Sequence, residues 1–151
     1  MIYLLSVLVI LLDQVSKMGV LGHVLEHEVV PVLPCFNLLL TFNKGVSFSL
    51  LSSDSPYAPL LLSAFALGVA GLLVYWIQKE KNTLTRWGLA LILGGAVGNV
   101  IDRIRFGAVV DFLDFYWGDY HWPAFNIADS AICIGVAILL FSSFKKGEKK
   151  K

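Results

Sequence analysis

The sequence predicts an all-α membrane protein with four transmembrane helices and a small extracytoplasmic β element. The first observation is the composition: 57% of the 151 residues are hydrophobic and only 15% are charged, whereas soluble domains average about 45–50% apolar and 25% charged residues. The second is a mean hydropathy of +0.74. The third is the presence of four apolar stretches, each close to the roughly 20 residues that a spanning helix needs. The net charge of +1 gives no indication of a nucleic-acid partner.

Together the four apolar stretches predict one integral membrane domain. They cover residues 2–21, 57–77, 86–105 and 128–144. The intervening loops 22–56 and 106–127 then lie on one side of the membrane. Eight of the 12 basic residues lie on the other side, in the loop after the second span and in the C-terminal tail. Because lysine and arginine accumulate on the cytoplasmic side, we expect both termini to be cytoplasmic and both long loops to be outside.

The first outer loop contains a predicted strand element. Residues 29–48 are rich in β-branched and aromatic side chains, and Asn43-Lys44-Gly45 within them is a turn signal. Residues 52–56, Ser-Ser-Asp-Ser-Pro, predict the cap that starts the second span. The second outer loop is dense in Phe, Tyr and Trp from Phe112 to Phe125, which is typical of the aromatic belt at a membrane surface.

The first span carries two ionisable residues, Asp13 and Lys17. Such residues are costly inside a membrane and are candidate functional residues by default. Their spacing of four places both on one helix face, which predicts an intrahelical ion pair facing the bundle. The alternative is that Lys17, near the outer end of the span, also supports a site there.

The third span combines small residues with a polar cluster. Gly94 and Gly98 form a small-xxx-small pair that lets helix backbones approach closely. Asn99, Asp102 and Arg103 then follow on one helix face, in the outer half of the span. This arrangement predicts one wall of a site at the outer membrane surface.

Two further carboxylates lie at the same membrane face. Asp111 is in the second outer loop, and Asp129 shares the first turn of the fourth span with Asn126. Taken singly, Asp111 could be a turn residue, and Asp129 could be a first-turn charge stabilised by the helix dipole. Two carboxylates beside Asn and Arg at one membrane face are harder to explain by packing, and they predict a functional site.

A close carboxylate pair has a defined chemistry. The two groups cannot both ionise freely, so they share a proton near neutral pH. The charged member can take a proton from water that attacks a peptide carbonyl, and the neutral member can donate one to the carbonyl oxygen or to the leaving amine. This hydrolysis needs no metal, no cofactor and no covalent intermediate.

Three other functions are compatible with parts of the sequence. His23-Val-Leu-Glu26-His27 matches an H-x-x-E-H zinc pattern, but such a site needs a stable helix and a third ligand, and neither is evident. The main rival is a small transporter or proton-relay protein, since intramembrane carboxylates also carry protons. A relay should reach the inner half of the bundle, where the sequence offers only the Asp13–Lys17 pair. A non-catalytic assembly subunit would not depend on the carboxylate pair.

Five sequence blocks, in their order and spacing, carry a family resemblance. They are Asp13-Gln-Val-Ser-Lys17, Asn43-Lys-Gly-Val-Ser-Phe48, Gly94-Gly-Ala-Val-Gly-Asn-Val-Ile-Asp-Arg103, Gly107-Ala-Val-Val-Asp111-Phe112 and Phe125-Asn-Ile-Ala-Asp129. With its four spans, the chain resembles the lipoprotein signal peptidases, also called type II bacterial signal peptidases. These are aspartic proteases of the bacterial inner membrane.

The resemblance implies roles for individual residues. Asp111 and Asp129 would be the catalytic pair, and Asp13 and Lys17 a mainly structural motif. Five further residues would line or support the site: Asn43, Asn99, Asp102, Arg103 and Asn126. Of these, we expect Asn99 and Asn126 to orient the carboxylates or the substrate backbone by hydrogen bonds, and Arg103 to balance charge near the site through Asp102.

The resemblance also implies a substrate. It would be a prolipoprotein that carries a diacylglyceryl group on a cysteine, and the cut would fall just before that cysteine. A lipid-bearing substrate must enter laterally from the bilayer, so membrane lipid is an expected partner. We expect the protein to act as a monomer.

Overall fold

Four long helices form the body of the protein, in a computed structural model that describes residues 1–45 and 57–148. The helices are α1 (Ile2–Leu21), α2 (Ala58–Lys79), α3 (Thr83–Phe106) and α4 (Ile127–Glu148). All four are long and apolar enough to cross a membrane, which confirms the predicted class. Helix α3 begins three residues earlier than predicted, because the Asn82 side chain accepts a hydrogen bond from the Thr85 backbone N–H and caps the helix. The predicted cap at 52–56 and the end of the predicted strand element, 46–48, lie outside the described residues.

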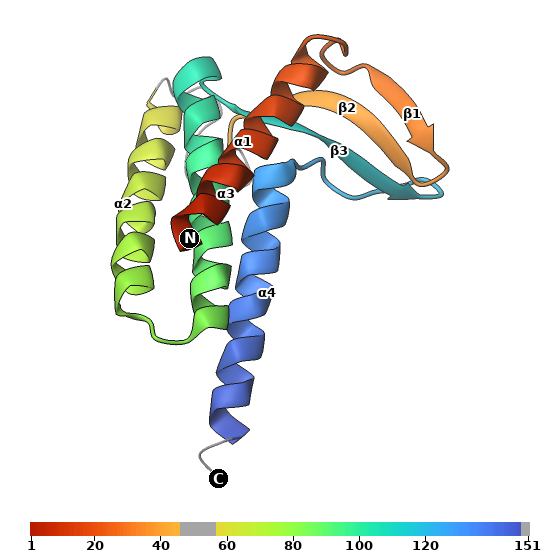
Figure 1. The fold of residues 1–151 in the computed structure, drawn as a ribbon. Coiled ribbons are helices and arrows are strands. Elements are labelled where there is room, and N and C mark those ends of the chain that lie inside the picture. The colour runs from red at the N-terminus through yellow and green to blue at the C-terminus, as the bar shows by residue number, and fades with distance from the viewer. Residues whose placement is uncertain (46–56, 149–151) are drawn as a thin grey trace.

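Helix α3 packs against each of the other three helices (Figure 1). Its small residues make these contacts close. A Cβ atom on Gly94 would lie 2.8 Å from the Ser6 backbone oxygen of α1, and one on Gly88 would lie 2.9 Å from the Gly135 oxygen of α4. The predicted small-residue face of the third span is therefore where the helix backbones meet.

We expect Gly95→Ala to lower the thermal stability of the protein. A Cβ atom at this position would overlap the Ala128 backbone oxygen and would lie 2.7 Å from the Ile132 side chain, and overpacking of this kind typically costs about 1–3 kcal/mol. Gly71→Ala in α2 is the matched control, because no atom lies within 4 Å of a Cβ there. Thermal unfolding in detergent measures both variants, and equal Tm values would contradict the role given to the α3–α4 contact.

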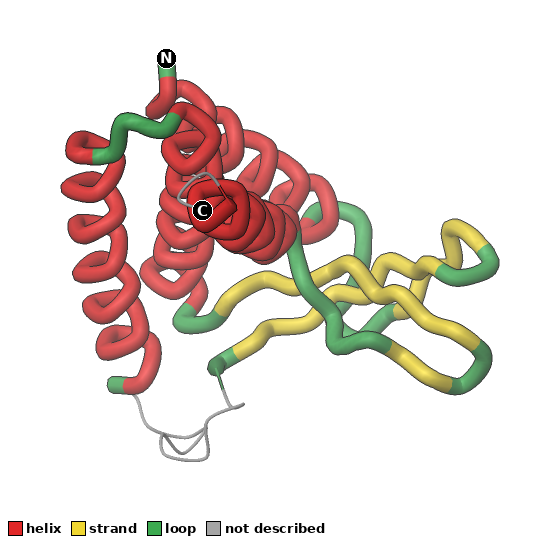
Figure 2. Tube along the Cα trace, turned by 90° about the horizontal axis from the view of Figure 1, so that it is seen from below, coloured by secondary structure: helices red, strands yellow, loops and turns green. Residues whose placement is uncertain are grey.

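A four-stranded antiparallel sheet extends sideways from the bundle, at the end where α1 and α3 finish and α4 begins (Figures 1 and 2). Its strands, in spatial order, are β1 (Val29–Leu33), β2 (Phe36–Asn43), β3 (Val109–Trp117) and β4 (Tyr120–His121). The first two strands confirm the predicted β element. Strands β3 and β4 occupy the loop for which only an aromatic belt was predicted. Strand β3 forms by pairing with β2, a long-range contact that no local pattern contains.

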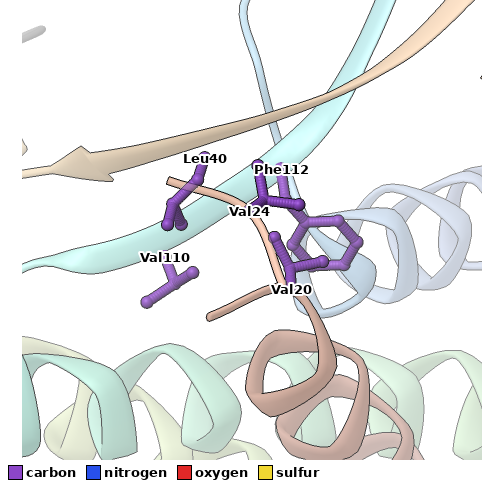
Figure 3. Packing of buried hydrophobic residues seen from close by; sticks show 5 residues of the cluster. All are labelled: Val20, Val24, Leu40, Val110 and Phe112. Atoms are coloured by element: carbon purple, nitrogen blue, oxygen red, sulfur yellow. The ribbon is translucent and has the colours of Figure 1, made fainter. Parts of the chain in front are cut away.

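A cluster of buried apolar side chains joins the sheet to the end of α1. Figure 3 shows its members, Val20 and Val24 from the end of α1 and the turn after it, Leu40 from β2, and Val110 and Phe112 from β3. Side chains alternate between the two faces of a strand. Because Val110 and Phe112 face this cluster, Asp111 between them is directed to the opposite face, toward the beginning of α4.

Candidate active site

The two predicted catalytic carboxylates belong to one hydrogen-bonded cluster. Asn126 donates through Nδ2 to Asp111 Oδ1 at 2.7 Å, and Asn99 donates through Nδ2 to Asp129 Oδ1 at 2.8 Å. The two asparagines are joined in turn, since Asn126 Nδ2 lies 3.3 Å from Asn99 Oδ1. Strand β3, helix α3 and the beginning of α4 therefore contribute to a single site.

Asn126 is oriented by the helix that follows it. Its Oδ1 accepts a hydrogen bond of 2.9 Å from the backbone N–H of Asp129, as an N-cap side chain does. This bond leaves the Nδ2 group to face Asp111. Asp129 lies in the first turn of α4, where the helix dipole favours a carboxylate. The local sequence at the beginning of α4 thus positions both the Asn126 amide, which bridges the two halves of the site, and the Asp129 carboxylate.

Asn43 holds the second oxygen of Asp111. Its Nδ2 donates to Asp111 Oδ2 at 2.9 Å, while its Oδ1 accepts from the Gly45 backbone N–H at 2.9 Å. Gly45 has a φ of +81°, a left-handed conformation that glycine adopts readily. The Asn-Lys-Gly turn after β2 therefore directs the Asn43 amide at the carboxylate on the neighbouring strand.

The two carboxylates have different surroundings. Asp111 is only 2% exposed, and Asp129 is half-buried. Burial raises the pKa of the Asp111 carboxyl to about 6, and the charge of Asp129 adds to the rise, while hydrogen bonds from Asn43 and Asn126 oppose it. The Asp111 carboxyl therefore keeps its proton to a higher pH than a solvent-exposed aspartate does.

Lys17 forms the predicted ion pair with Asp13 and has two further partners. Its Nζ lies 2.8 Å from Asp13 Oδ2 and 2.6 Å from Asp102 Oδ2, and it donates to Asn99 Oδ1 at 3.2 Å. Lys17 thus belongs to the site cluster as well as to its own helix, which the alternative interpretation anticipated.

Arg103 interacts electrostatically with three carboxylates of this region, those of Asp129, Asp102 and Asp111. In the described part of the chain no direct ion pair joins Arg103 to Asp102, whose carboxylate pairs with Lys17, and charge balance through Asp102 stays a prediction. Arg103 instead donates through Nη1 to the Asn99 backbone oxygen at 3.4 Å.

The histidines of the H-x-x-E-H pattern are not arranged as metal ligands. The segment follows the end of α1 rather than lying on a helix, and His27 has a φ of 64°. His23 Nδ1 pairs with the Gly19 backbone oxygen at 2.8 Å. Within residues 1–45 and 57–148, no group of three or more His, Cys, Asp or Glu side chains could hold a metal ion.

Comparison with known proteins decides the family. The family model for signal peptidase II matches residues 5–145. The chain belongs to the signal peptidase II family. It is therefore a peptidase that removes signal peptides from prolipoproteins, and a multi-pass bacterial membrane protein. This outcome favours hydrolysis over the transporter alternative.

Individual relatives agree with the signal peptidase II assignment. The lipoprotein signal peptidase of Vibrio vulnificus (strain CMCP6) is 49% identical over 125 residues, which cover 81% of this chain and 74% of that protein. That of Shewanella pealeana (strain ATCC 700345 / ANG-SQ1) is 44% identical over 151 residues, or 99% of this chain and 89% of that protein. A solved bacterial membrane enzyme superposes with a TM-score of 0.86 at 31% identity, covering 98% of this chain and 90% of its own.

This signal peptidase II chain also contains a site residue that the sequence analysis missed. Gln14 donates through Nε2 to Asp102 Oδ1 at 2.9 Å and to Asp13 Oδ2 at 3.2 Å, and its Oε1 accepts from Arg105 at 3.3 Å. A neutral amide does not stand out as a charged residue does. Its position between Asp13 and Lys17 in an otherwise apolar helix was the available signal.

Proposed function

We propose that Asp111 and Asp129 are the catalytic pair of an aspartic signal peptidase. Asp129, the more exposed carboxylate, takes a proton from the water that attacks the scissile carbonyl. Asp111, whose pKa is raised to about 6, holds the shared proton and donates it to the carbonyl oxygen or to the leaving amine. The observation that carries this proposal is the Asp111–Asn126–Asn99–Asp129 chain of hydrogen bonds, in which one carboxyl is buried and the other is not.

Four polar neighbours have supporting roles in this proposal. Asn43 and Asn126 orient Asp111, Asn99 orients Asp129, and Arg103 balances the negative charge of the pair. Arg103 also lines a cavity of about 380 Å³ between the beginning of α2 and the end of α3, together with Pro59, Leu60, Ser63, Ile104 and Gly107. This cavity is where we place the substrate segment next to the scissile bond.

We further propose that both termini are cytoplasmic and that the site faces outward. The charge distribution supports this orientation, and the site lies at the end of the bundle away from the C-terminus (Figure 1). The proposed substrate carries a diacylglyceryl group on a cysteine, and the cut falls just before that cysteine. The enzyme acts as a monomer, and the substrate reaches it through the bilayer.

The test is cleavage of a diacylated prolipoprotein by the purified protein in detergent. We expect release of the signal peptide by a single cut before the lipidated cysteine, identified by mass spectrometry of both products. Intact substrate after prolonged incubation with folded enzyme, or a cut at another bond, would contradict the proposal.

The pH dependence of kcat/KM reports the ionisation of the free enzyme. Because Asp111 must be protonated to donate, we expect kcat/KM to fall as the pH rises through about 6, the raised pKa of Asp111. The Asn43 hydrogen bond favours the ionised Asp111 carboxylate. Asn43→Ala should therefore move this descending limb of the kcat/KM profile to higher pH. Asn37→Ala is the matched control, because Asn37 makes the same kind of bond, at 2.9 Å, to Asp114 in the same sheet. A limb that stays in place in Asn43→Ala would contradict the role of Asp111.

We expect chelating agents to leave cleavage unchanged. The double variant His23→Ala/His27→Ala should also cleave at the wild-type rate, because both side chains are exposed and His23 pairs with the Gly19 backbone oxygen. The measurement is the initial rate with and without chelator. A loss of activity that added zinc restores would show that a metal takes part.

A further inference from the structure

We propose that Lys17 is a positioning residue that sets the geometry of the catalytic pair, acting through two carboxylates that hold the backbone next to each catalytic aspartate. This inference rests on the proposed function, since it assigns Lys17 a part in the work of Asp111 and Asp129. It goes beyond the ion pair that the sequence predicts.

Each donor of the buried Lys17 ammonium has an acceptor. Lys17 is 1% exposed, and its Nζ contacts Asp13 Oδ2, Asp102 Oδ2 and Asn99 Oδ1. An ammonium has three donors, so each of them has one partner. The position of the ammonium fixes those of both carboxylates, and it leaves the Asn99 Nδ2 group to face Asp129.

The Asp13 carboxylate links Lys17 to the beginning of α4. Its second oxygen, Oδ1, accepts a hydrogen bond of 2.9 Å from the backbone N–H of Ala128, the residue directly before Asp129. The first amides of a helix have no partner within the helix, so Asp13 supplies an acceptor from α1. Gly98 makes room for it, because a Cβ atom there would lie 2.7 Å from Asp13 Oδ2.

The Asp102 carboxylate links Lys17 to β3 in the same manner. Its Oδ2, the atom that contacts Lys17, accepts a hydrogen bond of 3.1 Å from the backbone N–H of Val110. Val110 directly precedes Asp111. Asp13 and Asp102, which both pair with Lys17, therefore accept hydrogen bonds from the backbone N–H groups of the residues directly before the two proposed catalytic aspartates.

This arrangement is better suited to fixing geometry than to adding stability. The cost of removing charges from water offsets much of the attraction in a buried ion pair. Catalysis, in contrast, is sensitive to position, and a displacement of about 1 Å can lower a rate by about 100-fold. Asp111 and Asp129 lie on separate elements, and Lys17 is linked to both by the two carboxylate bridges.

The test compares three purified variants on the same lipidated substrate. Lys17→Met removes the charge and all three donors, and kcat should fall by about 100-fold with little change in KM. Lys17→Arg keeps the charge but replaces a compact ammonium by a planar fork, so its kcat should lie between those of Lys17→Met and the wild type. Ser6→Ala is the control, because it removes a buried 2.8 Å bond between α1 and the Ala90 oxygen of α3 outside the network. It should lower Tm and keep kcat.

A second readout separates positioning from general stability. Among the described residues, the charged groups that act on Asp111 are Asp129 from α4, Arg103 from α3 and Lys17 from α1. Loss of the Lys17 charge disfavours the ionised Asp111 carboxylate. The limb of kcat/KM that reports Asp111 should therefore move to higher pH in Lys17→Met and stay in place in Ser6→Ala.

The outcomes are distinguishable. Wild-type kcat in folded Lys17→Met or in Lys17→Arg would overturn the inference, and so would an equal loss of kcat in Ser6→Ala. If Lys17→Met does not fold, Lys17→Arg decides, because it keeps the buried charges balanced. Cleavage by Asp111→Asn or Asp129→Asn would refute the catalytic pair itself. Inactive aspartate variants together with fully active Lys17 variants would refute only the positioning role.

Discussion

Asp111→Asn and Asp129→Asn should each lower kcat for prolipoprotein cleavage by about 10³–10⁴-fold, the upper part of the range for acid–base groups. Each substitution keeps the shape of the side chain and removes the ionisable group. The pair then has no proton to share, so water is not activated or the leaving group is not protonated. The measurement is single-turnover cleavage, with folding checked by the elution volume and Tm of the detergent-solubilised protein.

Asp114→Asn is the matched control for these two variants. Asp114 lies on the same strand as Asp111 and is equally buried, at 2% exposure. Its partners, however, are Asn37 and His121, the latter at 2.8 Å, and neither belongs to the site. Asp114→Asn should keep wild-type kcat. Near-normal cleavage by either site variant, or an equal loss in Asp114→Asn, would refute the assignment.

A precursor without its diacylglyceryl group should be cleaved with a kcat/KM lower by about 100-fold or more. Each buried CH₂ of an acyl chain contributes about 0.8 kcal/mol of membrane partitioning, so two chains fix the depth of the adjacent peptide bond. In our orientation that depth is the membrane surface where Asp111 and Asp129 lie. The unmodified precursor keeps its apolar signal helix and still reaches the bilayer, but nothing sets its register against the aspartates.

The comparison uses lipidated and unlipidated forms of one precursor in the same bilayer. The amount of each form bound to the membrane is measured separately, so that partitioning does not enter the ratio. Similar kcat/KM values would mean that the enzyme recognises only the peptide. The placement of the site at the lipid boundary would then be wrong.

Local patterns were sufficient to predict the helices and part of the site. The spans are continuous apolar runs, and Asp13 and Lys17 are one helical turn apart, so both features are visible in a short window. The third member of that cluster, Asp102, comes from α3 and reaches Lys17 only through helix packing. Arg103, its neighbour in the sequence, acts on Asp102 electrostatically without a direct ion pair among the described residues, so charge balance through Asp102 stays a prediction.

Strand β3 is a second feature that a short stretch of sequence could not predict. Its residues are apolar on both sides of Asp111 because both faces of the strand are covered, so the alternation that signals a strand is absent. Its partner is β2, from the other outer loop, and Asn43 reaches Asp111 across 68 positions of the chain. The sequence located the residues, and the sheet determined which of them meet.

The division of the site among α1, α3, β3 and the beginning of α4 has a consequence during synthesis. Asp13, which holds the amide directly before Asp129, is on α1, whereas Asp129 is on α4, so the ribosome releases Asp13 long before Asp129. A nascent chain that lacks α4 has only one carboxylate of the proposed pair. The α3 glycines that pack against α4 then have no packing partner. In the proposed mechanism, cleavage therefore cannot begin before α4 has packed against α3.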